Sequence, residues 1–226
     1  PEQMQGFDYW CNGDKALWIK VANQFKLRYA MRIVKANPTL AKQKAEEAVR
    51  GGVLTSADRD ILIDHGISNE LTRMFEWGDC GINANLTTIM AGFKDPRIDL
   101  YITKNKDDVK VKDATVVAKG TQYLGIRGGC SLPNKPNAWT NYSQAICSYA
   151  TPLPVMKVAE AYFLRAEGAL RGWAMGADAQ QLYEEGIRVS IQNELKYKKA
   201  YASIESISED EINKYINGTS KQLDYV

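Results

Sequence analysis

The segment that decides the fold reads VMKVAEAYFLRAEGALRGWAMGADAQQLYEEGIRVSIQ and spans residues 155–192. It follows Pro152 and Pro154, and proline is tolerated at the entrance of a helix but not inside one. Small and apolar residues then recur at steps of three and four, as on a helix with one apolar face. They are Met156, Ala159, Phe163, Ala166, Leu170 and Trp173. The first half of the segment is therefore predicted to be an amphipathic helix.

A second helix is expected after a short turn. Gly172 and Gly176 interrupt the apolar pattern, and Asp178 can cap the helix that follows. The apolar or small positions of that helix are Ala179, Leu182, Tyr183, Gly186, Ile187 and Ile191. Gly168 and Gly186 each cost about 1 kcal/mol relative to alanine inside a helix, so we expect two helix backbones to approach closely there. The segment is thus an αα-hairpin, the unit of tetratricopeptide-type repeats.

Residues 14–50 predict a second αα-hairpin. Asp14 can cap a long helix to about residue 36, which must end before Pro38 because the residue preceding a proline disfavours the helical conformation. Thr39 can cap a shorter, alanine-rich helix that stops at Gly51. The long helix is apolar on nearly all sides, so it is expected to lie inside the protein.

Two arginines, Arg28 and Arg32, lie four residues apart on this mostly apolar helix. A buried guanidinium needs an acidic partner, and losing that partner costs around 3–5 kcal/mol. Glu160 and Glu167 share a face of the helix that follows Pro154. We predict an ion-pair network of these four charged residues that joins the two hairpins. A ligand site built from the same charges is the alternative.

Between the hairpins, the helical period fades over residues 56–151. Glycine, proline and asparagine are frequent, and short β-branched runs predict strands at 98–103, 109–111 and 115–118. A short helix is expected at 85–92, and a capping box at Ser208 predicts a further helix near the C-terminal end. Such long irregular excursions commonly carry function. We predict one domain over 1–226, in which a helical frame carries an irregular insert.

Several aromatic residues lie outside the predicted helices. They are Tyr9, Trp10, Trp77, Tyr123, Trp139 and Tyr142. Sugar rings pack their C–H faces on indole and phenol rings, so exposed aromatics with polar neighbours predict a carbohydrate site. Two segments fit, and the predicted glycan-binding residues are Trp77, Asp79, Asn137, Trp139, Asn141 and Tyr142. The alternative is that each ring packs over the core as part of a loop.

Composition excludes several classes of protein. The formal net charge is +2, which argues against strong binding to nucleic acid or anionic lipid. No apolar run approaches the ~18 residues needed to span a bilayer. At 226 residues the chain can bury one sizeable core. Pro1 is not a natural start, so the sequence is expected to be a piece of a longer protein.

Catalysis is poorly supported by the sequence. The only histidine, His65, lies in a turn, without the context of a nucleophile or the spacing of a metal ligand. There is no phosphate loop and no dinucleotide fingerprint. No catalytic residue, metal or cofactor is therefore predicted. The four cysteines lack C-x-x-C spacing and are expected to be buried free thiols, with one disulfide in an exported protein as the alternative; they are Cys11, Cys80, Cys130 and Cys147.

Four blocks of the sequence carry a family resemblance. They are LWIKVANQFKLRYAMRI at 17–33, KDPRIDLYI at 94–102, GTQYLGIRGG at 120–129, and AEAYFLRAEGALRGW with LYEEGIRVSI between 159 and 191. In this order they resemble the SusD/RagB family, the surface nutrient-binding lipoproteins of Bacteroidetes. The resemblance covers most of the chain, whereas the lipoprotein region, the first repeats and the usual C-terminal segment of that family are not matched.

The resemblance implies a mainly α fold, with tetratricopeptide-like αα-hairpins in a superhelix, long irregular loops and a few short strands. It also implies an outer-membrane lipoprotein at the cell surface, held by a lipid anchor outside this sequence. Such a protein binds an oligosaccharide or other nutrient without chemistry, and its partner is a SusC-like TonB-dependent transporter. Two other functions stay open: a scaffold that binds proteins through its helical hairpins, and a carbohydrate hydrolase that uses two loop carboxylates.

Overall fold

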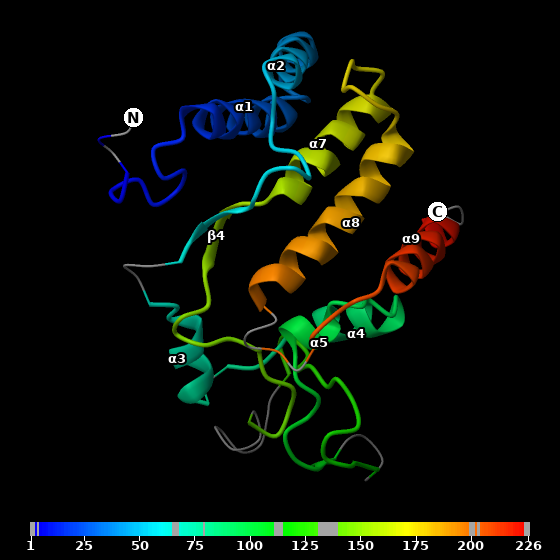
Figure 1. The fold of residues 1–226 in the computed structure, drawn as a ribbon. Coiled ribbons are helices and arrows are strands. Elements are labelled where there is room, and N and C mark those ends of the chain that lie inside the picture. The colour runs from blue at the N-terminus through cyan, green and yellow to red at the C-terminus, as the bar shows by residue number, and fades with distance from the viewer. Residues whose placement is uncertain are drawn as a thin grey trace. The chain divides into compact units, whose positions relative to one another are not determined.

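The computed structural model describes residues 3, 5–64, 68–78, 80–110, 115–130, 140–198, 202 and 204–223, the last five without their side chains. The chain forms two compact units, unit 1 (1–66 and 152–193) and unit 2 (67–151 and 194–226). Helices are the main regular secondary structure of both, as Figure 1 shows. The prediction of a mainly α protein with few short strands is confirmed, and the prediction of a single domain stays a prediction.

Unit 1 contains both predicted hairpins. The first consists of α1 (Lys15–Arg32) and α2 (Pro38–Arg50), and the second of α7 (Val158–Leu170) and α8 (Ala179–Lys198). The Asp14 carboxylate accepts the N–H of Leu17 at 3.0 Å and so caps α1 as predicted. Asn37, rather than Thr39, caps α2. Pro38 starts that helix, which leaves the residue before it as the cap.

The buried faces of these helices differ from the predicted stripes. In α1 the buried side chains are Val21, Gln24, Leu27, Ala30 and Met31. The same helix leaves Trp18 39% and Tyr29 63% exposed, so the expectation that it lies fully inside is wrong. In α7, Leu170 is 80% exposed. An apolar pattern that runs around a helix does not say which side meets the core, and here α2 and α7 pack on one side of α1.

The atoms nearest to the two helical glycines belong to side chains. A Cβ at Gly186 would stand 2.8 Å from the Phe163 ring, and one at Gly168 would stand 2.6 Å from the sulfur of Met175. The predicted close packing is therefore present, with a different partner. Phe163 also contacts Tyr183, with ring centroids 5.7 Å apart, so the hairpin is closed by aromatic packing between α7 and α8.

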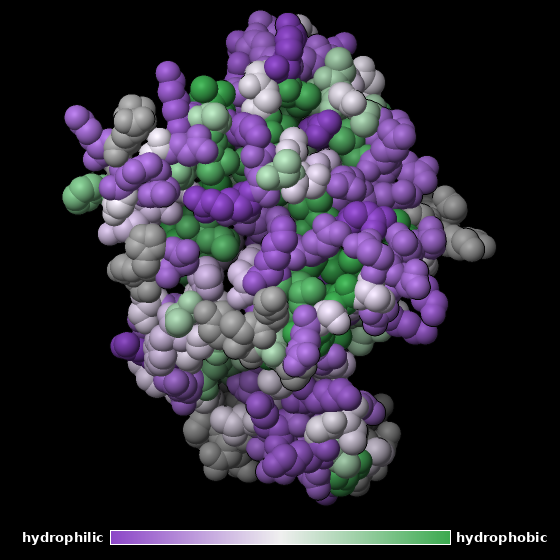
Figure 2. Space-filling view, in the orientation of Figure 1, coloured by the Kyte–Doolittle hydropathy of each residue, from purple (hydrophilic) through white to green (hydrophobic). Residues whose placement is uncertain are grey.

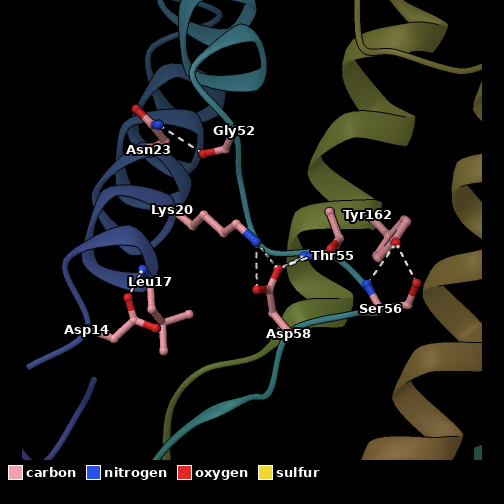
Figure 3. Close-up of polar contacts among 9 residues, drawn as sticks. All are labelled: Asp14, Leu17, Lys20, Asn23, Gly52, Thr55, Ser56, Asp58 and Tyr162. Carbon is pink, nitrogen blue, oxygen red and sulfur yellow. Dashed lines mark hydrogen bonds and ion pairs between the residues drawn. The ribbon is translucent and has the colours of Figure 1, made fainter. Parts of the chain in front are cut away.

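The segment after α2 is held to α1 and α7 by polar contacts (Figure 3). Asn23 donates to the Gly52 carbonyl at 2.9 Å. Lys20 pairs with Asp58 at 2.7 Å. Tyr162 of α7 accepts the N–H of Ser56 at 3.0 Å through its hydroxyl oxygen. These contacts fix the chain between the first hairpin and β1 (Ile61–Ile63).

Asp58 makes part of the stability of unit 1 dependent on pH. Burial opposes its charge, but hydrogen bonds from Lys20 and Thr55 outweigh that effect and lower the pKa of Asp58. A lowered folded pKa means stability that is present above the unfolded value of about 4 and is lost as pH falls through the folded value. We expect Asp58→Asn to cost about 1–2 kcal/mol at neutral pH and much less in acid. Urea unfolding at both pH values measures this, and an equal cost at both would contradict it.

The strands are short. In unit 1, β1 (Ile61–Ile63) pairs antiparallel with β4 (Leu153–Met156). The Asp60 carboxylate, beside β1, accepts the N–H of Val158 at 2.8 Å and that of the Asn193 amide at 2.9 Å. A carboxylate from a distant segment thus satisfies the first turn of α7, which lacks a local side-chain cap.

Unit 2 holds α3 (Leu71–Glu76), α4 (Ala84–Gly92), α5 (Ile98–Tyr101), β2 (Val109–Lys110), β3 (Val116–Val117) and α9 (Glu209–Leu223). Strands β2 and β3 pair antiparallel, within the predicted runs. The helix expected at 85–92 and the helix after Ser208 are confirmed. The strand expected at 98–103 is wrong. Asp95 accepts the N–H of Arg97 at 2.9 Å, and this local turn starts a helix instead.

Candidate functional site

The predicted glycan-binding residues fall in unit 2. Trp77 directly follows α3, and its side chain is 64% exposed. Asn141 and Tyr142 lie in a turn and are half-buried. Asp79, Asn137 and Trp139 lie outside the described residues, as does His65. Half of the predicted set can therefore be placed, and it contains one strongly exposed aromatic ring.

Helix α3 presents Trp77 together with other exposed apolar side chains. Leu71 is 46% and Met74 is 49% exposed. They lie three residues apart, so with Trp77 they share one side of this short helix and its end. We call Leu71, Met74 and Trp77 the α3 surface. Figure 2 shows one face of the molecule, on which hydrophobic residues reach the surface in patches separated by hydrophilic side chains.

Tyr149 belongs to the same neighbourhood and was not predicted. Its hydroxyl donates to Glu76 at 2.5 Å, and its ring is 38% exposed. The hydrogen bond to Glu76 raises the pKa of Tyr149, so this hydroxyl keeps its proton and stays a donor. Asn69, before α3, donates its N–H to the Tyr149 carbonyl at 3.0 Å. Tyr149 comes from a segment without a motif, so only the folded chain brings it to α3.

The other predicted residues have backbone roles. The Asn141 carbonyl accepts the N–H groups of Lys106 at 2.9 Å and Asp107 at 3.2 Å. Among the described residues, no hydrogen bond or ring contact joins Trp77 to Asn141 or Tyr142. The structure thus does not bring the two predicted segments together through their described side chains.

A buried asparagine organises the loops of unit 2. Asn105 is 2% exposed. Its side-chain oxygen accepts the N–H groups of Thr121 at 3.1 Å and Gln122 at 3.0 Å. Its side-chain nitrogen donates to the carbonyls of Asp107 and Ala118, both at 2.9 Å. Four bonds from one side chain replace regular secondary structure here, so an irregular segment can still present fixed side chains.

The predicted ion-pair network is reduced to one pair between the hairpins. Arg28 donates to both oxygens of Glu160, each at 2.5 Å. These hydrogen bonds to Glu160 raise the pKa of Arg28. Glu167 instead pairs with Arg171, one turn further along α7, at 2.6 Å. Arg32 is exposed and forms no ion pair with any residue that the structure describes. Because α1 is only partly buried, Arg32 reaches solvent and needs no acidic partner.

The chemistry of the described residues is sparse. They contain no group of three acidic, histidine or cysteine side chains placed to hold a metal ion. All four cysteines are free thiols, and Cys11 alone is buried, so the expectation of four buried thiols is wrong. Burial raises the pKa of Cys11 to about 11. No helix within the described ranges has the length and apolar character to cross a membrane.

Comparison with known proteins decides the family. The sequence pattern of the family described as "Susd and RagB outer membrane lipoprotein" matches residues 1–225. The chain belongs to the SusD-like family. No curated protein matches the sequence.

Solved structures of SusD-like proteins share the fold. One from Bacteroides thetaiotaomicron is 36% identical, with a TM-score of 0.74 over 86% of this chain and 39% of its own. A protein described as a chitin-binding SusD homolog from Flavobacterium johnsoniae is 35% identical, with a TM-score of 0.72 over 84% of this chain and 38% of its own. A homolog from Bacteroides ovatus is 30% identical, with a TM-score of 0.75 over 94% and 41%. This SusD-like chain thus spans about two fifths of the length of the structures it matches.

One block that carries the SusD resemblance has a structural role. Asp95, 5% exposed, accepts from the Arg97 guanidinium at 2.9 and 2.5 Å. The Tyr215 hydroxyl of α9 donates to the same carboxylate at 3.1 Å. Burial opposes the charge of Asp95, but the bonds from Arg97 outweigh it and lower the pKa of Asp95. The Asp-Pro-Arg block of this SusD-like protein therefore joins α5 to α9.

Proposed function

We propose that this SusD-like protein captures an oligosaccharide at the cell surface and passes it to a SusC-like TonB-dependent transporter. It performs no chemistry on the ligand. In this proposal it is an outer-membrane lipoprotein. Two facts support the choice of ligand: the chain belongs to a family of surface lipoproteins, and one relative is described as chitin-binding.

The observation that carries the proposal is the exposure of Trp77 on a fixed support. Trp77 is 64% exposed, so it offers apolar surface on which a ligand can stack. Stacking on such a face needs little ordering when the backbone is already held, and Asn69 and Tyr149 hold the two sides of this segment. The proposed site comprises the α3 surface and Tyr149. The predicted residues Asp79, Asn137, Trp139, Asn141 and Tyr142 remain proposed ligand-binding residues.

Substitution of Trp77 tests the site. We expect Trp77→Ala to weaken retention of the bound polysaccharide by about 2- to 10-fold, because one aromatic contact is lost. The measurement is affinity electrophoresis in gels that contain glycol chitin, amylopectin, xylan or mucin. Tyr29→Ala is the matched control, since Tyr29 is an equally exposed ring on α1. Equal retention of both variants would contradict the α3 site.

The same assay separates the other functions. Release of reducing ends from a retained polysaccharide would indicate a hydrolase. Retention by none of the four gels, with capture of peptides instead, would favour the protein-binding scaffold. A binding protein is expected to retain a polysaccharide and leave its chain length unchanged over long incubation.

A further inference from the structure

A second aromatic surface lies at the N-terminal end of unit 1. It surrounds a hollow of about 620 Å³ lined by Phe7, Asp8, Tyr9, Trp10, Gly13, Lys15 and Trp18. We call it the Trp18 hollow. Its volume is in the range of small-ligand sites, which are mostly apolar with a few polar groups. Phe7 is 78%, Tyr9 47% and Trp18 39% exposed, so the rings that line the hollow are open to solvent.

Asp8 fixes the shape of the hollow. One carboxylate oxygen accepts the N–H groups of Trp10 and Cys11, both at 3.1 Å. The other accepts the N–H of Gly13 at 2.9 Å and the indole N–H of Trp18 at 2.6 Å. Burial opposes the charge of Asp8, but these four hydrogen bonds together lower the pKa of Asp8. The carboxylate therefore ties the loop that carries Trp10 to the helix that carries Trp18.

The two indoles are also stacked. The rings of Trp10 and Trp18 lie 5.6 Å apart between centroids at an interplanar angle of 24°. The Trp10 ring also stacks with the Phe25 ring, with their centroids 6.4 Å apart. The Trp10 backbone carbonyl accepts a hydrogen bond from the Arg59 guanidinium at 2.8 Å. Trp10 is thus anchored to the core side. Trp18 stacks on it and is 39% exposed. A pair held in this way loses little freedom when a ligand binds.

Ring chemistry selects the ligand class. A pyranose ring has an apolar C–H face that fits an indole and an edge of hydroxyl groups that needs polar partners. The hollow is lined by the indole of Trp18 and by Tyr9 and Lys15, two residues whose side chains end in polar groups. Asp8 already accepts four N–H groups, so it acts by positioning the rings.

We infer that the Trp18 hollow is a second carbohydrate-binding site, which binds a sugar ring through stacking on Trp18 and Tyr9. This inference rests on the proposed function, because it assumes that the protein binds a glycan. It differs from the α3 site in every residue. The two sites therefore make separate predictions for the same probe.

The test uses the full chain and the polysaccharide gels described above. We expect Trp18→Ala and Tyr9→Ala each to weaken retention of the bound polysaccharide by about 2- to 10-fold. Asp8→Asn should also weaken retention of the polysaccharide. The asparagine amide would place N–H donors against the N–H donors of Gly13 or Trp18, so the hydrogen bonds that hold the hollow would be lost. That variant should also reduce the near-ultraviolet circular dichroism of the stacked indoles, which a residue that only contacts the ligand would not change.

Each outcome decides between the proposals. Loss of retention in the Tyr9 and Trp18 variants, with Tyr29→Ala unchanged, supports the hollow. Full retention by both, with loss in Trp77→Ala, overturns the hollow and keeps the proposed function. Retention of no polysaccharide by the unaltered chain overturns both. Tyr9→Ala keeps the test valid if Trp18→Ala unfolds, because Tyr9 is 47% exposed and outside the helices.

Discussion

Replacement of Asp95 by alanine is expected to lower the free energy of unfolding by about 3–5 kcal/mol, the cost of breaking a buried ion pair from one side. The Arg97 side chain is 21% exposed and the Asp95 side chain 6%, so water can replace the lost carboxylate only in part. The variant also removes the acceptor of the Tyr215 hydroxyl, which links α9 to this pair. Urea denaturation followed by far-ultraviolet circular dichroism measures the change.

An exposed ion pair of the same unit provides the control. Arg73 and Glu70 lie 2.9 Å apart, with side chains 51% and 58% exposed. Glu70→Ala is expected to cost about 0–1 kcal/mol, as for other exposed pairs. If Asp95→Ala and Glu70→Ala lower the free energy of unfolding by the same small amount, the prediction that burial strengthens the Asp95 pair is wrong. If Asp95→Ala is destabilised but Asp95→Asn is as stable as the unaltered protein, the hydrogen bonds of this side chain, and not its charge, account for the stabilisation.

Gly125→Ala is expected to destabilise the protein by about 2–3 kcal/mol or more, through overpacking against a backbone that cannot move aside. A Cβ at Gly125 would stand 2.5 Å from the Cα of Ala84 and 2.6 Å from its nitrogen. Both sides of this contact are held by hydrogen bonds. Ala84 donates its N–H to the Ile126 carbonyl at 2.9 Å, and Ile126 donates its own to the Ile82 carbonyl at 2.7 Å. Relief of the clash would break one of them.

Gly128, three residues further on, is the matched control. A Cβ there would stand 3.7 Å from the Asn83 side chain, an ordinary contact, so Gly128→Ala is expected to change stability by no more than about 0.5 kcal/mol. Thermal unfolding of the two variants side by side measures the difference. Equal unfolding midpoints for the two variants would contradict the prediction, because they would mean that the backbone at Ala84 can shift to accommodate the new methyl group.

Much of the helical frame could be predicted because its signals are local. Asp14 caps α1 and Ser208 caps α9, and both caps act within three residues of themselves. The strand predicted at 98–103 failed because Asp95 and Arg97 form a turn whose effect outweighs the β-branched residues after it. Strand propensity is a weak prior that depends on context, so it does not by itself decide the structure of so short a segment.

The candidate sites could be predicted only in part. Trp77 was found because an aromatic residue beside glycine and acidic residues suggests an exposed loop. Tyr149 was not predicted, because it lies 72 positions after Trp77 in the sequence. Its hydroxyl reaches this part of the chain only in the folded protein, through a hydrogen bond to Glu76, the residue before Trp77. The Trp18 hollow was missed for a similar reason. Trp10 was seen as a loop residue and Trp18 as a core residue, and the Asp8 carboxylate joins them.

The helices of the two hairpins, the helix Ala84–Gly92 and the helix after Ser208 could be recognised from the sequence alone, as could the family that the blocks resemble. Periodicity, caps and helix-breaking residues act over a few positions, so they can be recognised without the fold. Only the tertiary structure decided which face of α1 is buried, that Glu160 and not Glu167 meets Arg28, and which aromatic rings stay open to a ligand. Burial and ion pairing depend on what other segments place nearby, and no local pattern contains that information.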